Sequence, residues 1–289
     1  MTDVVTLAAG SATAAIALVG AEPVAWQVDG RDLLWSGDPA HWSYRAPILF
    51  PRVGASSGGM VQIDGALYPM GQHGFARTER FDVVERDAAS ARLRLVDTDE
   101  TRTHYPFSFR LDVVATLAPT ALSLAFEVVN TDGDPLPYAL GFHPAFPWPL
   151  DGAGRDGHRV LFAEAERPEV PEVAAGGLLA RRTRPIPLAG RELPLTPAMF
   201  TEALVFLDAG SREMSFGAPS GAAVRMRTDG FPHLAVWSRP TAPFLSLECW
   251  TGHADWEDAE GELAERASMI SLRPGETGRH AVQLGWIAA

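Results

Sequence analysis

Short runs of strand-forming residues, separated by proline, glycine and aspartate turns, dominate this sequence. In residues 92–96, polar and apolar side chains alternate, a period of two that is typical of a half-buried strand. Residues 26–34 have the pattern of a hairpin, with Asp29 and Gly30 in its turn. Further β-prone runs lie at 111–117, 122–129, 203–207, 223–227, 234–237, 244–249 and 280–287.

Signals for helices are scarce. The chain has 27 glycines and 23 prolines, which favour turns over long helices. The acidic stretch 255–266 could form only a turn or two, because Gly261 interrupts it. Residues 151–195 are expected to form a long excursion, or a cover over one end of the fold. The sequence therefore predicts an all-β fold of two large, mainly antiparallel sheets, with residues 1–289 as a single domain.

Charge and composition exclude several classes of function. The formal net charge of -12 argues against nucleic acid and anionic membranes as partners. All 24 basic residues are arginines, so no Schiff-base or P-loop lysine is available. Cys249 is the only cysteine, which excludes an intrachain disulfide and fits a cytoplasmic protein. No apolar run reaches the ~18 residues of a membrane span, and no arginine precedes Arg31 to begin a signal peptide.

Three polar islands interrupt the strand pattern, around His73, His143 and Glu248. Each has a titratable residue in an apolar, aromatic setting with glycine or proline, which restricts water and shifts pKa values. Pro144 favours an extended backbone at His143. Glu248 ends an apolar run and, by alternation, shares a strand face with Ser246. A carboxylate in such a strand is costly unless it is paired or functional.

Each candidate residue also has a purely structural interpretation. His73 and His143 could be buried histidines satisfied by hydrogen bonds, and Glu248 could face solvent on an edge strand. Arg52 follows an apolar run and could be a surface arginine. Trp237 could belong to the core or form a stacking platform for a sugar.

Familiar cofactor and nucleophile motifs are absent from the sequence. The other histidines have no metal-ligand spacing, and neither H-E-x-x-H nor a Cys/His cluster occurs. G-x-S-x-G and G-x-G-x-x-G are also missing, which argues against a serine hydrolase and a dinucleotide-binding site. Two histidines, one glutamate and several arginines, without metal or cofactor, suit proton transfer on a neutral polyol.

The order and spacing of the three islands resemble the aldose 1-epimerase (galactose mutarotase-like) superfamily. The resemblance is to the branch of short mutarotase-like proteins that carry a Q-H-G-F-A-R island, here residues 72–77. It implies a β-supersandwich with a shallow sugar cleft and no cofactor or metal. The other segments that carry the resemblance extend it over nearly the whole chain: 33–35, 48–52, 141–146, 236–238, 248–252 and 272–276.

The resemblance also implies roles for the two residues that would perform catalysis. Glu248 matches the general base, which would accept a proton from the C1 hydroxyl of the sugar. His143 matches the general acid, which as an imidazolium would donate a proton to the ring oxygen. The ring would open to the aldehyde, and rotation about C1–C2 would precede closure by the same pair acting in reverse.

The remaining matched positions imply contacts with the sugar hydroxyls. His73 and Arg52 match hydroxyl binders of the family, and Arg77 joins them. The substrate-binding aspartate of the family corresponds here to Glu202, which is one methylene longer. This departure affects the hydroxyl contacts, and with them the sugar preference.

The predicted function is therefore that of a cytoplasmic aldose 1-epimerase, monomeric or homodimeric, acting on a free aldohexose. One alternative is a hexose-6-phosphate 1-epimerase, which needs extra positive charge from Arg77 or from arginines within 151–195. Another is a non-catalytic carbohydrate-binding or sugar-sensing domain. A glycosidase would need a second carboxylate opposite Glu248, for which only Glu202 and Asp255 are available.

Overall fold

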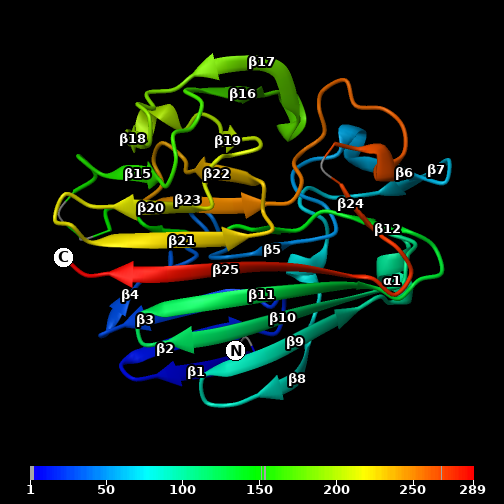
Figure 1. Cartoon of the computed structure of the whole chain (residues 1–289), viewed down its shortest axis with the longest axis horizontal. Helices are drawn as coiled ribbons and strands as arrows, with labels where there is room; N and C mark the ends of the chain where they lie inside the picture. The colour runs from blue at the N-terminus through cyan, green and yellow to red at the C-terminus, as the bar shows by residue number, and fades with distance from the viewer. Residues whose placement is uncertain (1–2, 151, 153, 268) are drawn as a thin grey trace.

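The computed structural model describes residues 3–150, 152, 154–267 and 269–289. Its largest sheet has nine strands, and every strand pairing in this part of the chain is antiparallel (Figure 1). The neighbouring strands of this sheet are, in order, β18 (Glu192–Pro194), β15 (Arg159–Phe162), β20 (Glu213–Gly217), β21 (Ala223–Asp229), β25 (Thr277–Ile287), β11 (Ala121–Asn130), β10 (Phe109–Ala118), β9 (Ser90–Val96) and β8 (Asp82–Arg86).

The second layer consists of two smaller sheets, which lie behind the nine-stranded sheet in Figure 1. The first contains β1 (Val4–Ala9), β2 (Ala12–Ala17), β3 (Pro23–Val28) and β4 (Arg31–Asp32). The other contains β19 (Leu204–Phe206), β22 (His233–Trp237), β23 (Phe244–Trp250), β13 (Gly141–Phe142), β5 (Ile48–Leu49) and β14 (Ala145–Pro147), which pairs with β23.

Aromatic side chains join the two layers. The rings of Phe126 on β11 and Phe142 on β13 are 6.3 Å apart, and both side chains are fully buried. Phe162 on β15 packs on Phe206 of β19 with ring centroids 4.8 Å apart. Burying one such side chain contributes roughly 1.5–3 kcal/mol. The predicted sandwich of large antiparallel sheets is confirmed, with the second layer divided into two sheets.

The predicted strands and the scarcity of helix are also confirmed. Residues 26–34 form the expected hairpin, in which Val28 pairs with Arg31 across Asp29 and Gly30. The acidic stretch 255–266 contains only the 3-10 turn Leu263–Glu265. The other helical segments are α1 (Asp99–Arg102) and the 3-10 turns Ser57–Gly59, Ala76–Thr78, Ala175–Gly177 and Pro197–Met199.

The excursion predicted at 151–195 is partly sheet and partly cover. Its strands β15 and β18 extend the nine-stranded sheet. Between them, β16 (Glu169–Val173) and β17 (Leu179–Pro185) form a separate hairpin at the top of Figure 1. The backbone of Leu179 bonds to Asp255 and Glu257, which ties this hairpin to the island around Glu248. A second separate hairpin is formed by β6 (Met60–Ile63) and β7 (Ala66–Pro69). A long-range pairing joins β12 (Leu136–Tyr138) to β24 (Ile270–Leu272) in another two-stranded sheet.

No helix in the described part of the chain is long and apolar enough to cross a membrane.

Candidate active site

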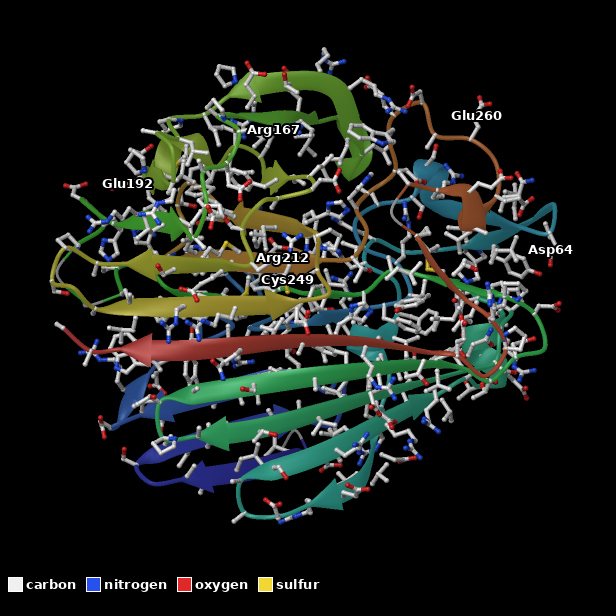
Figure 2. All side chains as sticks on the ribbon, viewed as in Figure 1. Asp64, Arg167, Glu192, Arg212, Cys249 and Glu260 are labelled. Carbon is white, nitrogen blue, oxygen red and sulfur yellow. The ribbon has the colours of Figure 1, made fainter. Side chains whose placement is uncertain are left out.

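Strand β23 has one face in the core and the other in a cavity. Leu247 and Cys249 belong to the apolar core, and Figure 2 shows Cys249 in the interior of the molecule. Glu248 lies between them and lines the cavity, although only 2 % of it is exposed. The alternation predicted for this run therefore turns the carboxyl group away from the core. It does not face solvent on an edge strand, because β23 is paired on both sides.

The register of the sheet brings His143 opposite Glu248. On one side of His143, Phe142 pairs with Cys249, and on the other Ala145 pairs with Ser246. Cross-strand neighbours have Cβ atoms about 4.5–5.5 Å apart, within reach of a direct side-chain contact. The Nε2 atom of His143 lies 3.2 Å from Oε1 of Glu248, and both side chains are buried. We refer to these two residues as the Glu248–His143 pair.

Burial controls the protonation of this pair. It raises the pKa of Glu248 well above its ordinary value, against a smaller opposing effect of Trp250 Nε1, which donates to Oε2 at 3.1 Å. Burial also lowers the pKa of His143 well below its ordinary value. The charged imidazolium that the resemblance implies is therefore favourable only while a carboxylate stays in contact with it. Moving one proton across the 3.2 Å contact converts the neutral pair into that charged form.

His73 is held as a neutral imidazole at the cavity wall. The Gly54 N–H donates to its Nδ1 at 3.1 Å, so the ring proton is on Nε2. Burial, and to a smaller extent the charge of Arg77, lower the pKa of His73 to about 3. Its backbone has a φ of 70°, an uncommon value for a non-glycine residue. The Nε2–H of His73 is therefore available as a hydrogen-bond donor. The ring centroids of His73 and His143 are 6.0 Å apart.

Gly74 explains why the island around His73 can lie so close to β5. Its φ is +67°, and a Cβ atom at this position would lie 2.3 Å from the carbonyl oxygen of Phe50. Only glycine fits this approach. This close approach holds the adjacent His73 at the wall of the cavity.

Two tryptophans form an aromatic wall beside the pair. Trp237 pairs with Ser246 across the β22–β23 ladder, so it faces the cavity side, as a stacking platform for a sugar would have to. The ring of Trp42 lies 4.8 Å from His143, and that of Trp237 lies 5.4 Å from both. Such a wall offers flat apolar surface to the C–H face of a sugar ring.

The position of Arg52 differs from both sequence interpretations. Its side chain is 1 % exposed, forms an ion pair with Asp255 and donates to Ser56 Oγ at 3.3 Å. It is thus neither a surface arginine nor among the residues that line the cavity. A buried guanidinium needs a charged partner, and Asp255 supplies it beneath the site. The role of hydroxyl binder that the resemblance implies for Arg52 stays a prediction.

The other matched residues do line the cavity, which has a volume of about 390 Å³. Arg77 donates to the Gln72 carbonyl at 2.8 Å and lies over the ring of Tyr44. The carboxylate of Glu202 accepts from Val173 N–H at 3.0 Å and pairs with Arg184 at 3.4 Å. Glu202 therefore lines the cavity and also holds the β16–β17 hairpin over it, and its contact with a sugar stays a prediction.

Comparison with known proteins connects this geometry to a family. The model of the aldose 1-epimerase family matches residues 3–186. The chain belongs to the aldose 1-epimerase family. It is 29% identical to protein LacX of Lactococcus lactis, over 89% of this chain and 90% of LacX.

Solved structures agree with this membership. A galactose mutarotase-like protein from Lactobacillus casei is 27% identical and superposes with a TM-score of 0.91, over 99% of this chain and 100% of the other. A galactose mutarotase related enzyme from Lactobacillus acidophilus is 26% identical, with a TM-score of 0.90 over 99% and 98% of the two chains. The supersandwich fold expected for an aldose 1-epimerase is thus shown.

Sequence reasoning missed several cavity residues of this family member. Trp42 lies in a loop without alternation, so no periodic signal pointed to it. Arg239 follows the end of β22, and its position directly after the matched 236–238 segment was the only available hint. Gln72, Thr201 and Trp250 also line the cavity. No group of three or more His, Cys, Asp or Glu side chains within the described ranges could hold a metal ion, and independence from metals stays a prediction.

Proposed function

We propose that this chain is an aldose 1-epimerase that interconverts the α and β anomers of a free aldohexose. The 3.2 Å contact between Glu248 Oε1 and His143 Nε2, inside a sugar-sized cavity, carries this proposal. Membership of the aldose 1-epimerase family supports it. The reaction needs one proton acceptor and one proton donor beside a single carbon atom, and the pair offers both.

The two oxygen atoms at the anomeric carbon define the proposed mechanism. Glu248 accepts the proton of the C1 hydroxyl. The electrons of that hydroxyl's O–H bond then form the carbonyl group at C1. The bond from C1 to the ring oxygen breaks, and His143 donates its Nε2 proton to that oxygen. After rotation about C1–C2, the ring oxygen returns its proton to His143 and attacks C1, while Glu248 gives its proton to the carbonyl oxygen. A positioned acid or base contributes about 10²–10⁴-fold to the rate.

The surrounding residues are suited to holding a neutral sugar. The Nε2–H of His73 would donate to a hydroxyl or to the ring oxygen as charge develops there. The aromatic wall of Trp42 and Trp237 would contact the C–H face of the sugar. Arg77 and Glu202 would bind the remaining hydroxyls, with Glu202 also fixed by Val173.

A glycosidase is a poorer match to the same residues. It needs two carboxyl groups about 5–5.5 Å or 6.5–9.5 Å apart. The partner of Glu248 is an imidazole, and Asp255 forms an ion pair with Arg52. The other available carboxylate, Glu202, is engaged by the Val173 N–H and by Arg184. This pairing supports reversible ring opening over hydrolysis.

Polarimetry of freshly dissolved α-glucose and α-galactose tests the proposal. We expect the optical rotation to reach equilibrium faster with the protein than in buffer alone, in proportion to the protein concentration. Heat-denatured protein is the control. Sugar binding without acceleration, detected by calorimetry, would instead support a carbohydrate-binding or sugar-sensing domain.

The pH dependence of the reaction should report the shared proton of the pair. Burial disfavours the cationic form with two protons and the anionic form with none. The pKa for gaining the second proton is therefore lowered, and the pKa for losing the shared proton is raised. We expect kcat/KM for α-glucose to stay level through the ordinary pKa of histidine and to fall only well to either side. A step in the rate at that pH would contradict a shared proton.

A hexose 6-phosphate is a second candidate substrate, because two arginines line the cavity without a carboxylate partner among the described residues. Arg77 donates to the Gln72 carbonyl, and Arg239 donates to the His41 carbonyl at 2.9 Å. If a phosphate binds there, Arg239→Gln should raise KM for glucose 6-phosphate by about 10-fold. KM for free glucose, measured on the same variant, should not change. An equal change in both constants would remove this candidate.

A further inference from the structure

We infer that Ser246 is a positioning residue that holds His143 in the tautomer whose Nε2 is free to exchange a proton with Glu248. The inference deepens the proposed function and rests on it for its catalytic consequence. Ser246 lies on β23, two residues before Glu248, so both side chains lie on the same face of the strand. Its side chain is fully buried.

Two contacts of the Ser246 hydroxyl decide where its hydrogen is. The Oγ atom lies 2.8 Å from Nδ1 of His143 and 2.8 Å from the carbonyl oxygen of Pro144. A carbonyl oxygen can only accept, and a hydroxyl has one hydrogen to donate. Ser246 therefore donates to Pro144 and accepts from the Nδ1–H of His143. The opposite orientation would leave two acceptor oxygens 2.8 Å apart without a proton between them.

The backbone holds the carbonyl group of Pro144 in place as the acceptor for the Ser246 hydroxyl. The same carbonyl oxygen accepts from the Leu247 N–H at 3.1 Å, which fixes it against β23. Ser246 itself pairs with Ala145 in the β14–β23 ladder. The acceptor, the hydroxyl and the imidazole are therefore held by one sheet register.

The consequence concerns the other nitrogen of the ring. With a proton fixed on Nδ1, the neutral imidazole of His143 has a lone pair on Nε2, facing Glu248 at 3.2 Å. It can then gain and lose the catalytic proton without changing tautomer. In the other tautomer Nε2 already carries the proton, so it cannot accept one from the carboxyl group of Glu248. A histidine in the wrong tautomer is known to cost catalytic power even when its position is unchanged.

The Ser246→Ala variant tests the catalytic consequence. We expect kcat for mutarotation to fall about 10- to 100-fold with KM nearly unchanged, because sugar contacts are retained. The pH–rate profile should also move to lower pH. In this variant the Nδ1–H of His143 has lost the Ser246 oxygen as its acceptor. Forms of the pair without a proton on Nδ1 therefore become relatively more stable, which lowers the pKa for losing the shared proton. A variant with wild-type kcat and an unmoved profile would overturn the inference.

Ser238→Ala is the matched control. Ser238 is also buried and follows the neighbouring strand β22, and its hydroxyl donates to the Phe244 carbonyl at 2.6 Å. Removing it deletes a buried hydroxyl without touching His143. We expect kcat and the pH–rate profile of this variant to match the wild type.

Nitrogen-15 NMR of histidine-labelled protein tests the tautomer independently of activity. In the wild type, Nδ1 of His143 should have the chemical shift of a protonated ring nitrogen and Nε2 that of an unprotonated one. In Ser246→Ala the two assignments should exchange. An unprotonated Nδ1 in the wild type would overturn the inference even if the variant failed to fold. If the protein accelerates no mutarotation, the proposed function fails while the NMR result still decides the role of Ser246.

Discussion

Replacing Glu248 with glutamine should remove about 10²–10⁴-fold of the catalysed mutarotation rate while the protein stays folded. The amide has the same shape but cannot accept the proton of the C1 hydroxyl. Its oxygen can still accept the hydrogen bond from Trp250 Nε1. Burial raises the pKa of Glu248, so this position favours a neutral group over a charged one, and the amide is expected to be accepted there. Polarimetry measures the rate, and thermal unfolding followed by circular dichroism checks the fold.

His143→Asn provides the partner experiment. We expect a loss of similar size, and the Glu248→Gln/His143→Asn double variant should be little slower than the slower single variant. Residues that act as one unit have effects that do not add. Wild-type rates in both single variants would end the assignment of this pair as acid and base. Additive losses would show that the two residues act in separate steps.

The second large effect is on stability, at the carboxylate beneath the site. Asp255→Ala should lower the free energy of unfolding by about 3–5 kcal/mol, because it leaves buried guanidinium groups without a counter-charge. Asp255 pairs with Arg52 and lies 3.4 Å from Arg266, and its own side chain is 2 % exposed. Urea unfolding measures the loss.

An exposed ion pair gives the control for this prediction. Asp3 and Arg80 lie 2.8 Å apart, with side chains 64% and 55% exposed. Asp3→Ala should change the stability little, because solvent screens such a pair. If Asp255→Ala unfolded at the urea concentration of the wild type and only raised KM for the sugar, the structural role of the Arg52–Asp255 pair would be wrong. Arg52 would then return as a candidate hydroxyl binder.

Much of the fold could be predicted because strand period and turn chemistry are local. Residues 92–96 alternate over so short a distance that no distant contact is needed to recognise β9, and Asp29 and Gly30 suffice to predict the hairpin around them. The 151–195 excursion was recognised by composition alone. Composition could not show that β15 and β18 join the large sheet while β16 and β17 form a cover, because sheet pairing depends on partners elsewhere in the chain.

The candidate site, too, could be predicted only in part from the sequence. Alternation in β23 is enough to put Glu248 on a different face from Leu247 and Cys249. It could not reveal that Ser246 contacts His143, because that contact depends on a β-bridge between segments far apart in the chain. Trp42 and Arg239 lie outside any period, so only the assembled cavity identifies them.

By itself, the sequence determined the class of fold, the faces of the strands and the chemical groups available, because each of these follows from residue type and near-neighbour spacing. The tertiary structure decided which of those groups meet. The antiparallel register of β13 and β14 on β23 sets His143 opposite Glu248. Burial decided the different outcome for Arg52, since a guanidinium removed from water stays with the carboxylate that neutralises it.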